Sequence, residues 1–140
     1  MAIWVYPVKK EEGLVDIFTN GDEHVLQVAG GRSLTFFAGG WGRGDCTVDL
    51  PADWLNHWHF LAGVCDTGGL QLYIDGSLRG FTPLEGGGVL SGGGNVWMIG
   101  RNAEFPGQRI FEGRVDRPMI ILEALDAGAV RALYGSGVGK

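Results

Sequence analysis

Cysteine is scarce in this sequence of 140 residues, which contains only Cys46 and Cys65. Neither belongs to a C-x-x-C pair or to a cysteine–histidine pattern with metal-ligand spacing, which argues against a structural zinc site. Because free cysteines are usually buried, we expect both to be reduced thiols packed in the core. A single disulfide between them stays open as the alternative.

Basic residues and long apolar runs are also few. The 11 lysines and arginines are outnumbered by 16 aspartates and glutamates, and the formal net charge is -5. Nucleic acids and anionic membranes attract proteins through a basic field, so neither is an expected partner. No apolar run approaches the roughly eighteen residues that span a bilayer. The composition therefore predicts a soluble protein.

Glycine, by contrast, makes up 26 of the 140 residues. The glycines have no collagen-like period and lie between short apolar runs, as the turns of an all-β protein require. A chain of this length can bury one core, so residues 1–140 are expected to form a single domain.

The most informative pattern lies in residues 58–76, which we interpret as two antiparallel strands. Asp66-Thr67-Gly68-Gly69 supplies the tight turn between them. The opposite face of the first arm is apolar as well, so this arm is predicted to be an interior strand covered on both sides. Alternate positions are apolar with the period of a pleated strand: Trp58, Phe60, Ala62 and Val64 in the first arm, and Leu70, Leu72 and Ile74 in the second.

One helix is predicted near the C-terminus, with Asp126 as its N-cap, a hydrophobic staple between Leu125 and Val130, and Gly135 as its stop. About ten short strands with frequent turns indicate an all-β fold. We predict a two-sheet antiparallel β-sandwich of the jelly-roll kind with one short C-terminal helix. Besides the hairpin, strands are predicted at residues 3–6, 13–18, 24–29, 32–38, 46–50, 78–81, 96–101 and 110–122.

Several motifs follow one another in the order found in a known family. They are Trp58-His59-Phe60-Leu61-Ala62-Gly63-Val64 with Leu72-Tyr73-Ile74-Asp75-Gly76, then Ile99-Gly100-Arg101, Phe111-x-Gly113-x-Val115-Asp116, Ala124-Leu125-Asp126 and Leu133-Tyr134. In these motifs, and in its opening Ile3-Trp4-Val5-Tyr6-Pro7, the chain resembles the laminin G-like domains of the concanavalin A-like lectin and glucanase superfamily. The resemblance implies the sandwich fold. It leaves sugar binding, protein adhesion and hydrolysis open, because this fold serves all three.

The resemblance also implies expectations about metal, oligomeric state and location. Calcium is common in the family, and Asp22, Asp66 and Asp116 offer hard oxygen ligands, but turn chemistry explains the first two, so no cofactor or metal ligand is assigned. Family members have one or two strands before the equivalent of Ile3. Their absence opens a sheet edge, so a homodimer that continues a sheet is expected. The family is usually extracellular, but no signal peptide is visible before Ile3, so the location is left open.

Hydrolysis lacks the residues that it needs. Glycosidases of this superfamily carry E-x-D-x-x-E on one strand, and no glutamate here is followed by aspartate two residues later. Glu112 and Asp116, four residues apart on the last predicted strand, would stand roughly 13 Å apart, beyond the about 5 to 9.5 Å of paired glycosidase carboxylates. His59 is interpreted as a hydrogen-bonded structural histidine. A hydrolase is therefore the least favoured interpretation.

A non-catalytic binding module is favoured, because sugars bind to exposed aromatic rings with polar groups beside them. Trp41, flanked by glycines and followed by Arg43 and Asp45, is the first candidate site, although this ring could equally fold back over the core. Trp54 is the second candidate, with core packing favoured. Tyr73 points away from Leu70, Leu72 and Ile74, towards either a concave binding face or a covered one. The other tryptophans lie within predicted strands and are assigned to the core: Trp4, Trp58 and Trp97.

Two functional classes stay open at this point. The first is weak binding of a neutral or mildly basic glycan, since the acidic net charge disfavours polyanionic sugars. The second is a structural or protein-interaction domain that self-associates through its sheet edges. The expected partner is therefore a glycan or another protein.

Overall fold

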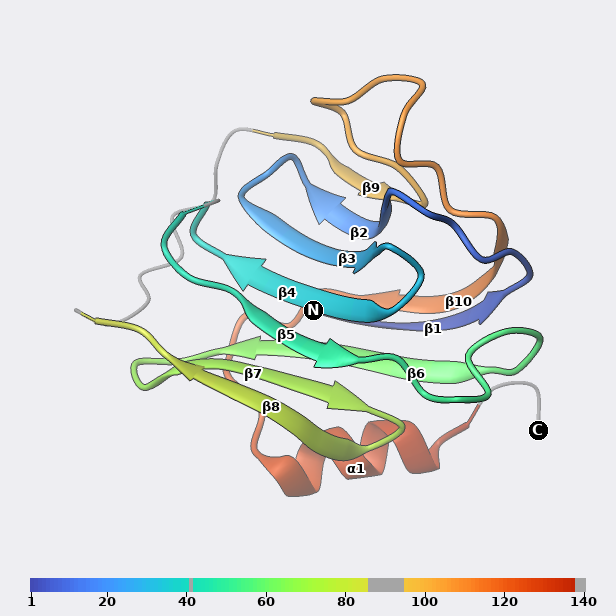
Figure 1. Ribbon diagram of the computed structural model, residues 1–140. Coiled ribbons are helices and arrows are strands. Elements are labelled where there is room, and N and C mark those ends of the chain that lie inside the picture. Colours follow the sequence, from blue (N-terminus) through green and yellow to red (C-terminus); the bar gives the residue numbers. More distant parts are fainter. Residues whose placement is uncertain (41, 86–94, 138–140) are drawn as a thin grey trace.

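The computed structural model describes residues 1–40, 42–85 and 95–137. Two antiparallel sheets pack face to face. One helix lies against one of these sheets, on the face that points away from the other sheet (Figure 1). The predicted all-β fold, a two-sheet antiparallel sandwich with a short C-terminal helix, is confirmed.

The sheet next to the helix is called the helix-side sheet here, and the other is called the outer sheet. The helix-side sheet contains, in spatial order, β10 (Gly113–Met119), β1 (Ala2–Pro7), β6 (His59–Cys65), β7 (Gly69–Ile74) and β8 (Ser77–Pro83). The outer sheet contains β5 (Cys46–Asp49), β4 (Ser33–Ala38), β3 (His24–Ala29), β2 (Leu14–Asn20) and β9 (Trp97–Ile99).

Strand β1 lies inside the helix-side sheet rather than at its edge. Trp4 pairs with Asp116 of β10 on one side and with Phe60 of β6 on the other. The open edge that was expected next to Ile3 is therefore closed by β10. In the described part of the chain, the edge strands are β8 and β10 in this sheet and β5 and β9 in the outer sheet.

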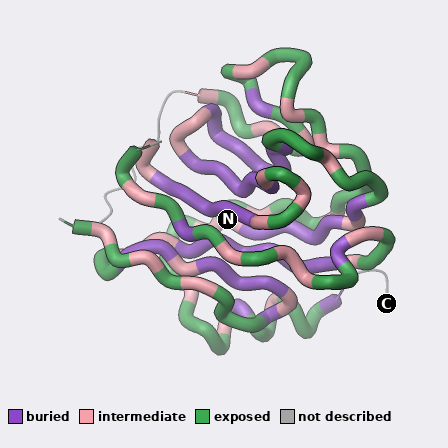
Figure 2. Tube along the Cα trace, viewed as in Figure 1, coloured by how far each residue is buried: buried purple, intermediate pink, exposed green. Residues whose placement is uncertain are grey.

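The predicted hairpin forms β6 and β7, with Leu61 opposite Ile74 and Gly63 opposite Leu72. Strand β6 is buried on both faces, as predicted, and the buried segments run through the middle of both sheets (Figure 2). A Cβ atom on Gly63 would collide with the ring of Phe36 on β4. Glycine at this position is therefore what allows the two sheets to approach each other closely.

Two apolar clusters hold the fold together. The larger lies between the sheets, and its fully buried members include Ile3, Ile17, Phe37, Leu61 and Leu72. The smaller lies between the helix-side sheet and the helix, and it includes Trp4, Phe60, Tyr73 and Val130. The cysteines are free thiols, as expected, with Cys46 buried and Cys65 half-buried.

Helix α1 (Ala127–Gly135) begins as predicted, because the Asp126 carboxylate caps it by accepting a hydrogen bond from a first-turn amide at 2.8 Å. The helix ends at Gly135, where the stop was predicted, but Gly135 does not adopt the left-handed backbone of a glycine terminator. Ser136 caps the helix, and the left-handed residue is Gly137, with φ of 67°. The nine-residue helix is the one helix of the described ranges, and it is too short to cross a membrane.

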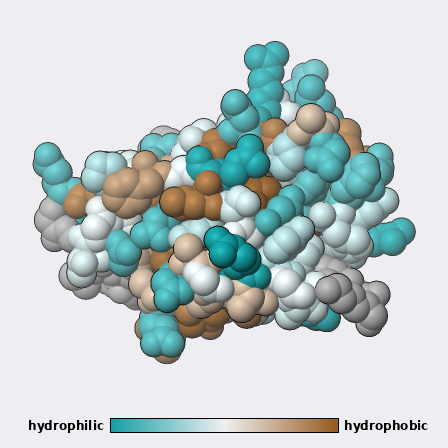
Figure 3. All heavy atoms as spheres, turned by 90° about the horizontal axis from the view of Figure 1, so that it is seen from below, coloured by the Kyte–Doolittle hydropathy of each residue, from teal (hydrophilic) through white to brown (hydrophobic). Residues whose placement is uncertain are grey.

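Strand β10 is shorter than the predicted strand at residues 110–122. Arg117 adopts a left-handed backbone, with φ of 47°, and Pro118 follows it, which shifts the pairing with β1. Residues 120–125 leave the sheet and form a connecting segment that runs to α1. Seen from below, on the side of α1, the surface has separate hydrophobic patches between hydrophilic side chains (Figure 3).

Candidate functional site

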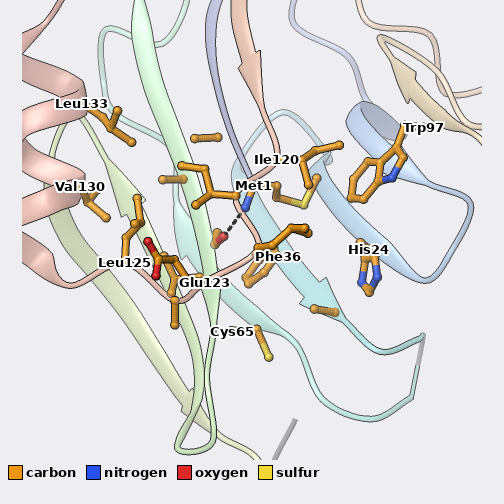
Figure 4. Close-up of a pocket in the computed structure, with 18 residues that line it drawn as sticks. Met1, His24, Phe36, Cys65, Trp97, Ile120, Glu123, Leu125, Val130 and Leu133 are labelled. Carbon is orange, nitrogen blue, oxygen red and sulfur yellow. Dashed lines mark hydrogen bonds between the residues drawn. The ribbon is translucent and has the colours of Figure 1, made fainter. Parts of the chain in front are cut away.

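A cavity of about 420 Å³ opens at the end of the sandwich where β1 begins and β6 ends. Side chains from both sheets, from the connecting segment 120–125 and from α1 surround it (Figure 4). Most of these side chains are apolar, and they include Phe36, Val64, Ile120, Leu125, Val130 and Leu133. The cavity is therefore an apolar chamber built from residues that are far apart in the sequence.

Trp97 and His24 form one wall of this chamber (Figure 4). Their rings are stacked, with centroids 5.7 Å apart, and Trp97 is 37% exposed. The assignment of Trp97 to the core was therefore wrong. The apolar run from Val96 to Ile99 looks like a buried strand in the sequence, but among the described residues β9 pairs with β2 alone and lies at a sheet edge.

His24 also connects the chamber to the glycine-rich loop of residues 39–45. The Gly39 amide donates a hydrogen bond to His24 Nδ1 at 3.4 Å, and the preceding Ala38 lines the chamber. Burial lowers the pKa of His24 below its usual value. The imidazole is therefore mostly neutral near pH 7, with Nδ1 as an acceptor.

Two polar residues of the predicted site lie on this loop. Arg43 and Asp45 are both exposed. The Asp45 carboxylate accepts a hydrogen bond from the Thr47 hydroxyl at 2.9 Å, and the Arg43 side chain passes next to Gly39. Trp41, the first predicted platform, lies outside the described residues.

The other two predicted site residues lie elsewhere and are covered. Trp54 is 7% exposed and stacks on His59, with ring centroids 5.2 Å apart. Tyr73 is buried beneath α1, and its hydroxyl donates a hydrogen bond to Gln71 at 3.2 Å. Neither residue lines the chamber, so the face towards which Tyr73 points is the covered one.

His59 is the hydrogen-bonded structural histidine that was predicted. Its Nδ1 lies 2.9 Å from an Asp75 carboxylate oxygen and its Nε2 lies 3.2 Å from the Asp53 carbonyl oxygen. Burial by itself would lower the pKa of His59, but these hydrogen bonds and the charges of Asp75 and Asp53 raise it overall. Both ring nitrogens can donate only when the ring is protonated, so the surroundings favour the imidazolium.

The family model described as the concanavalin A-like lectin/glucanases superfamily matches residues 1–131. The chain belongs to this superfamily. The comparison with curated protein sequences finds no match.

Three of the solved structures that share this sandwich are described as carbohydrate-binding or as complexes with a sugar. A candidate carbohydrate-binding protein from Bacteroides ovatus ATCC 8483 has a TM-score of 0.75 at 17% identity, over 93% of this chain and 38% of that one. The CBM40 of the Ruminococcus gnavus IT-sialidase, bound to α2,3-sialyllactose, has a TM-score of 0.66 at 17% identity. The match covers 96% of this chain and 80% of that one. The third is domain 4 of AbnA, an extracellular GH43 arabinanase from Geobacillus stearothermophilus, in complex with arabinotriose. It has a TM-score of 0.60 at 20% identity, and the match covers 95% of this chain and 64% of that one. The chain thus spans 38% of the first protein and 64% of the arabinanase domain structure, and at these identities the likeness shows the fold.

The three aspartates that the sequence offers as calcium ligands all lie close to N–H groups of the protein. Asp22 lies 3.7 Å from the Arg109 guanidinium, Asp66 accepts hydrogen bonds from two amides of its own turn, and Asp116 lies 3.5 Å from Arg117. No three histidine, cysteine, aspartate or glutamate side chains of the described residues come together as metal ligands. No metal ligand is therefore assigned among the described residues.

The charged side chains on β10 and just before it also have partners. Glu112, which precedes β10, lies 2.9 Å from Lys9 Nζ, and the guanidinium of Arg114 lies over the ring of Tyr6, 5.2 Å from its centroid. Together with Asp116 they form an exposed row of alternating charge, which is the solvent-facing arrangement expected of such a strand.

Proposed function

We propose that this chain is a non-catalytic binding module that binds a neutral or mildly basic glycan weakly at the end of the sandwich that holds the chamber. The observation that carries the proposal is the exposed ring of Trp97, stacked on His24 beside the loop of Arg43 and Asp45. An aromatic face with donors and acceptors next to it suits a sugar, whose rings have apolar faces and polar rims.

Trp41 belongs to this proposal as a second stacking platform, with Arg43 and Asp45 as its polar partners. The loop places Arg43 and Asp45 in solvent, where they can reach a ligand. The net charge of -5 opposes polyanionic glycans, especially at low salt. The related folds that bind arabinotriose and sialyllactose support sugar binding as the function of this sandwich.

The test is a glycan array followed by titration of the ligands found. Replacing Trp97 or Trp41 with alanine should weaken binding about tenfold, because each ring contributes about 1.4 kcal/mol of contact. Tyr134→Ala is the matched control, because Tyr134 has the same 37% exposure and its side chain does not line the chamber. The proposal fails if no glycan binds, or if both tryptophan variants bind as the wild type does.

A self-associating interaction domain is the second candidate, because β9 is an apolar edge strand. Val96 and Ile99 are exposed, and β9 pairs on one side only in the described part of the chain. Edge strand β10 differs, since Arg114, Pro118 and neighbouring charges discourage pairing.

This candidate predicts a dimer in sedimentation equilibrium at high micromolar concentration. Ile99→Lys should shift the protein to monomer, because a lysine on the edge disfavours strand pairing. A wild type that is monomeric at this concentration would exclude the candidate.

A further inference from the structure

The apolar chamber begins where the proposed sugar site ends. Trp97 and Ala38 belong to its lining, and the residue after Ala38 is held to His24 by its amide. From this wall the chamber continues to Val130 and Leu133 of α1 (Figure 4). A sugar held against Trp97 would therefore have an apolar chamber directly beside it.

The size of the chamber suits a ligand site. It opens to solvent and measures about 420 Å³, and small-molecule sites span about 300 to 1,000 Å³. An apolar group of a ligand is the occupant that suits such a lining.

The charged groups of the lining decide what kind of apolar group fits. Burial lowers the pKa of the Met1 amino group to about 6, and this group donates a hydrogen bond to the Gly63 carbonyl at 2.9 Å. His24 is neutral for the same reason, and the Cys65 thiol stays protonated because burial raises its pKa. Glu123 is exposed and acidic. The chamber therefore offers no full positive charge to an anionic tail near pH 7, and a neutral aliphatic chain suits it best.

We propose that the chamber binds the aliphatic chain of an amphipathic saccharide, an alkyl- or acyl-substituted glycan whose sugar lies against Trp97 and beside Arg43 and Asp45. This inference rests on the proposed function, because the sugar site supplies the head-group contacts. Because the sugar site and the chamber adjoin each other, the best ligand has a sugar for the first and an aliphatic chain for the second.

The experiment titrates the protein with ethyl, butyl, hexyl and octyl β-glucosides below their micelle concentrations, using calorimetry. Affinity should rise about two- to fourfold with each added methylene until the chamber is full, because each buried methylene contributes a roughly constant free energy. Octanol is titrated in parallel and should bind more weakly than octyl glucoside. An affinity that does not depend on chain length overturns the inference.

Two matched variants locate the effect. Ile120 lines the chamber and is 46% exposed, whereas Ile110 is 41% exposed and lies outside the lining. Ile120→Asp should abolish the dependence on chain length by placing a carboxylate at the chamber, and Ile110→Asp should preserve it. Both positions are exposed enough for the fold to tolerate the change, which circular dichroism can check. Equal behaviour of the two variants overturns the inference.

The remaining outcomes separate this inference from the proposed function. Glycans that bind on the array without any gain from an alkyl chain leave the proposed function intact and overturn the chamber's role. Octanol that binds as tightly as octyl glucoside overturns the amphipathic saccharide, and the array then decides the proposed function independently. A dimer that Ile120→Asp dissociates, in a protein that binds no glucoside, assigns the chamber to a second copy of the chain and also overturns the inference.

Discussion

The molecule contains two stacked tryptophan–histidine pairs with almost the same geometry and very different surroundings. Trp54 and His59 have ring centroids 5.2 Å apart and planes inclined by 22°, and Trp97 and His24 have centroids 5.7 Å apart and planes inclined by 23°. The first pair is buried and its histidine bonds through both ring nitrogens. The second pair forms the wall of the chamber, with the tryptophan partly in solvent.

The difference shows that the stacking contact does not by itself indicate a role. His59 lies on an interior strand and satisfies a carboxylate and a carbonyl, so its pair holds the fold. His24 accepts a long hydrogen bond from the Gly39 amide, and Trp97 lies on a strand at the edge of the described sheet and is 37% exposed. The same pair of side chains is buried where the sheet covers it and partly exposed where the described sheet ends.

The largest effect that would separate the two pairs is on stability. Trp54→Ala should lower the free energy of unfolding by about 3 to 5 kcal/mol, because it empties a buried aromatic site. Trp97→Ala should cost under about 1 kcal/mol, because its ring is partly exposed and its strand lies at an edge. Urea unfolding followed by circular dichroism measures both. A loss for Trp97→Ala as large as that for Trp54→Ala would contradict the distinction drawn between the pairs.

A smaller effect is expected in the pH dependence of stability, where the two histidines should have opposite signs. The pKa of His59 is raised above its usual 6.5 in the fold, so its stabilising contribution is complete below about pH 6.5 and is lost as the pH rises through the raised value. The pKa of His24 is lowered from 6.5, so the unfolded chain binds a proton first and the fold loses stability as the pH falls below about 6.5.

Thermal midpoints between about pH 5 and about pH 8, where histidines titrate, test both signs. His59→Gln should remove the decline on the alkaline side of the profile, and His24→Gln should remove the decline on the acidic side. If the two variants change the same side of the profile, one of the pKa directions is wrong.

Much of the fold could be predicted because its signals are local. The hairpin can be predicted from one short stretch of sequence, which contains a turn followed by the alternating apolar residues Leu70, Leu72 and Ile74. The capping of α1 by Asp126 is equally local. The left-handed glycine that follows the helix is Gly137 rather than Gly135, because both offer the same conformational freedom and the packing of the helix decides which one adopts it.

The site was less predictable because its decisive features are tertiary. Trp97 lies in an apolar run that reads like a core strand, and its exposure follows from the order of strands in the sheet. The chamber joins Met1, Phe36, Val64 and Leu133, which no sequence window contains. Arg43 and Asp45 were predicted on an exposed loop because consecutive glycines exclude a regular element there, and both are exposed. Their binding role stays a prediction, as does that of Trp41.

The position of β1 between β10 and β6 affects how the chain reaches its native state. This strand precedes all the others in the sequence, yet one of its two neighbours is β10, so that Trp4 must find Asp116. Pairings of such long sequence separation carry a large loop-closure cost and slow the search for the native topology. During synthesis, one side of β1 therefore lacks its partner until β10 has emerged from the ribosome. In that interval the unpaired side of β1 is the surface that a chaperone would have to shield.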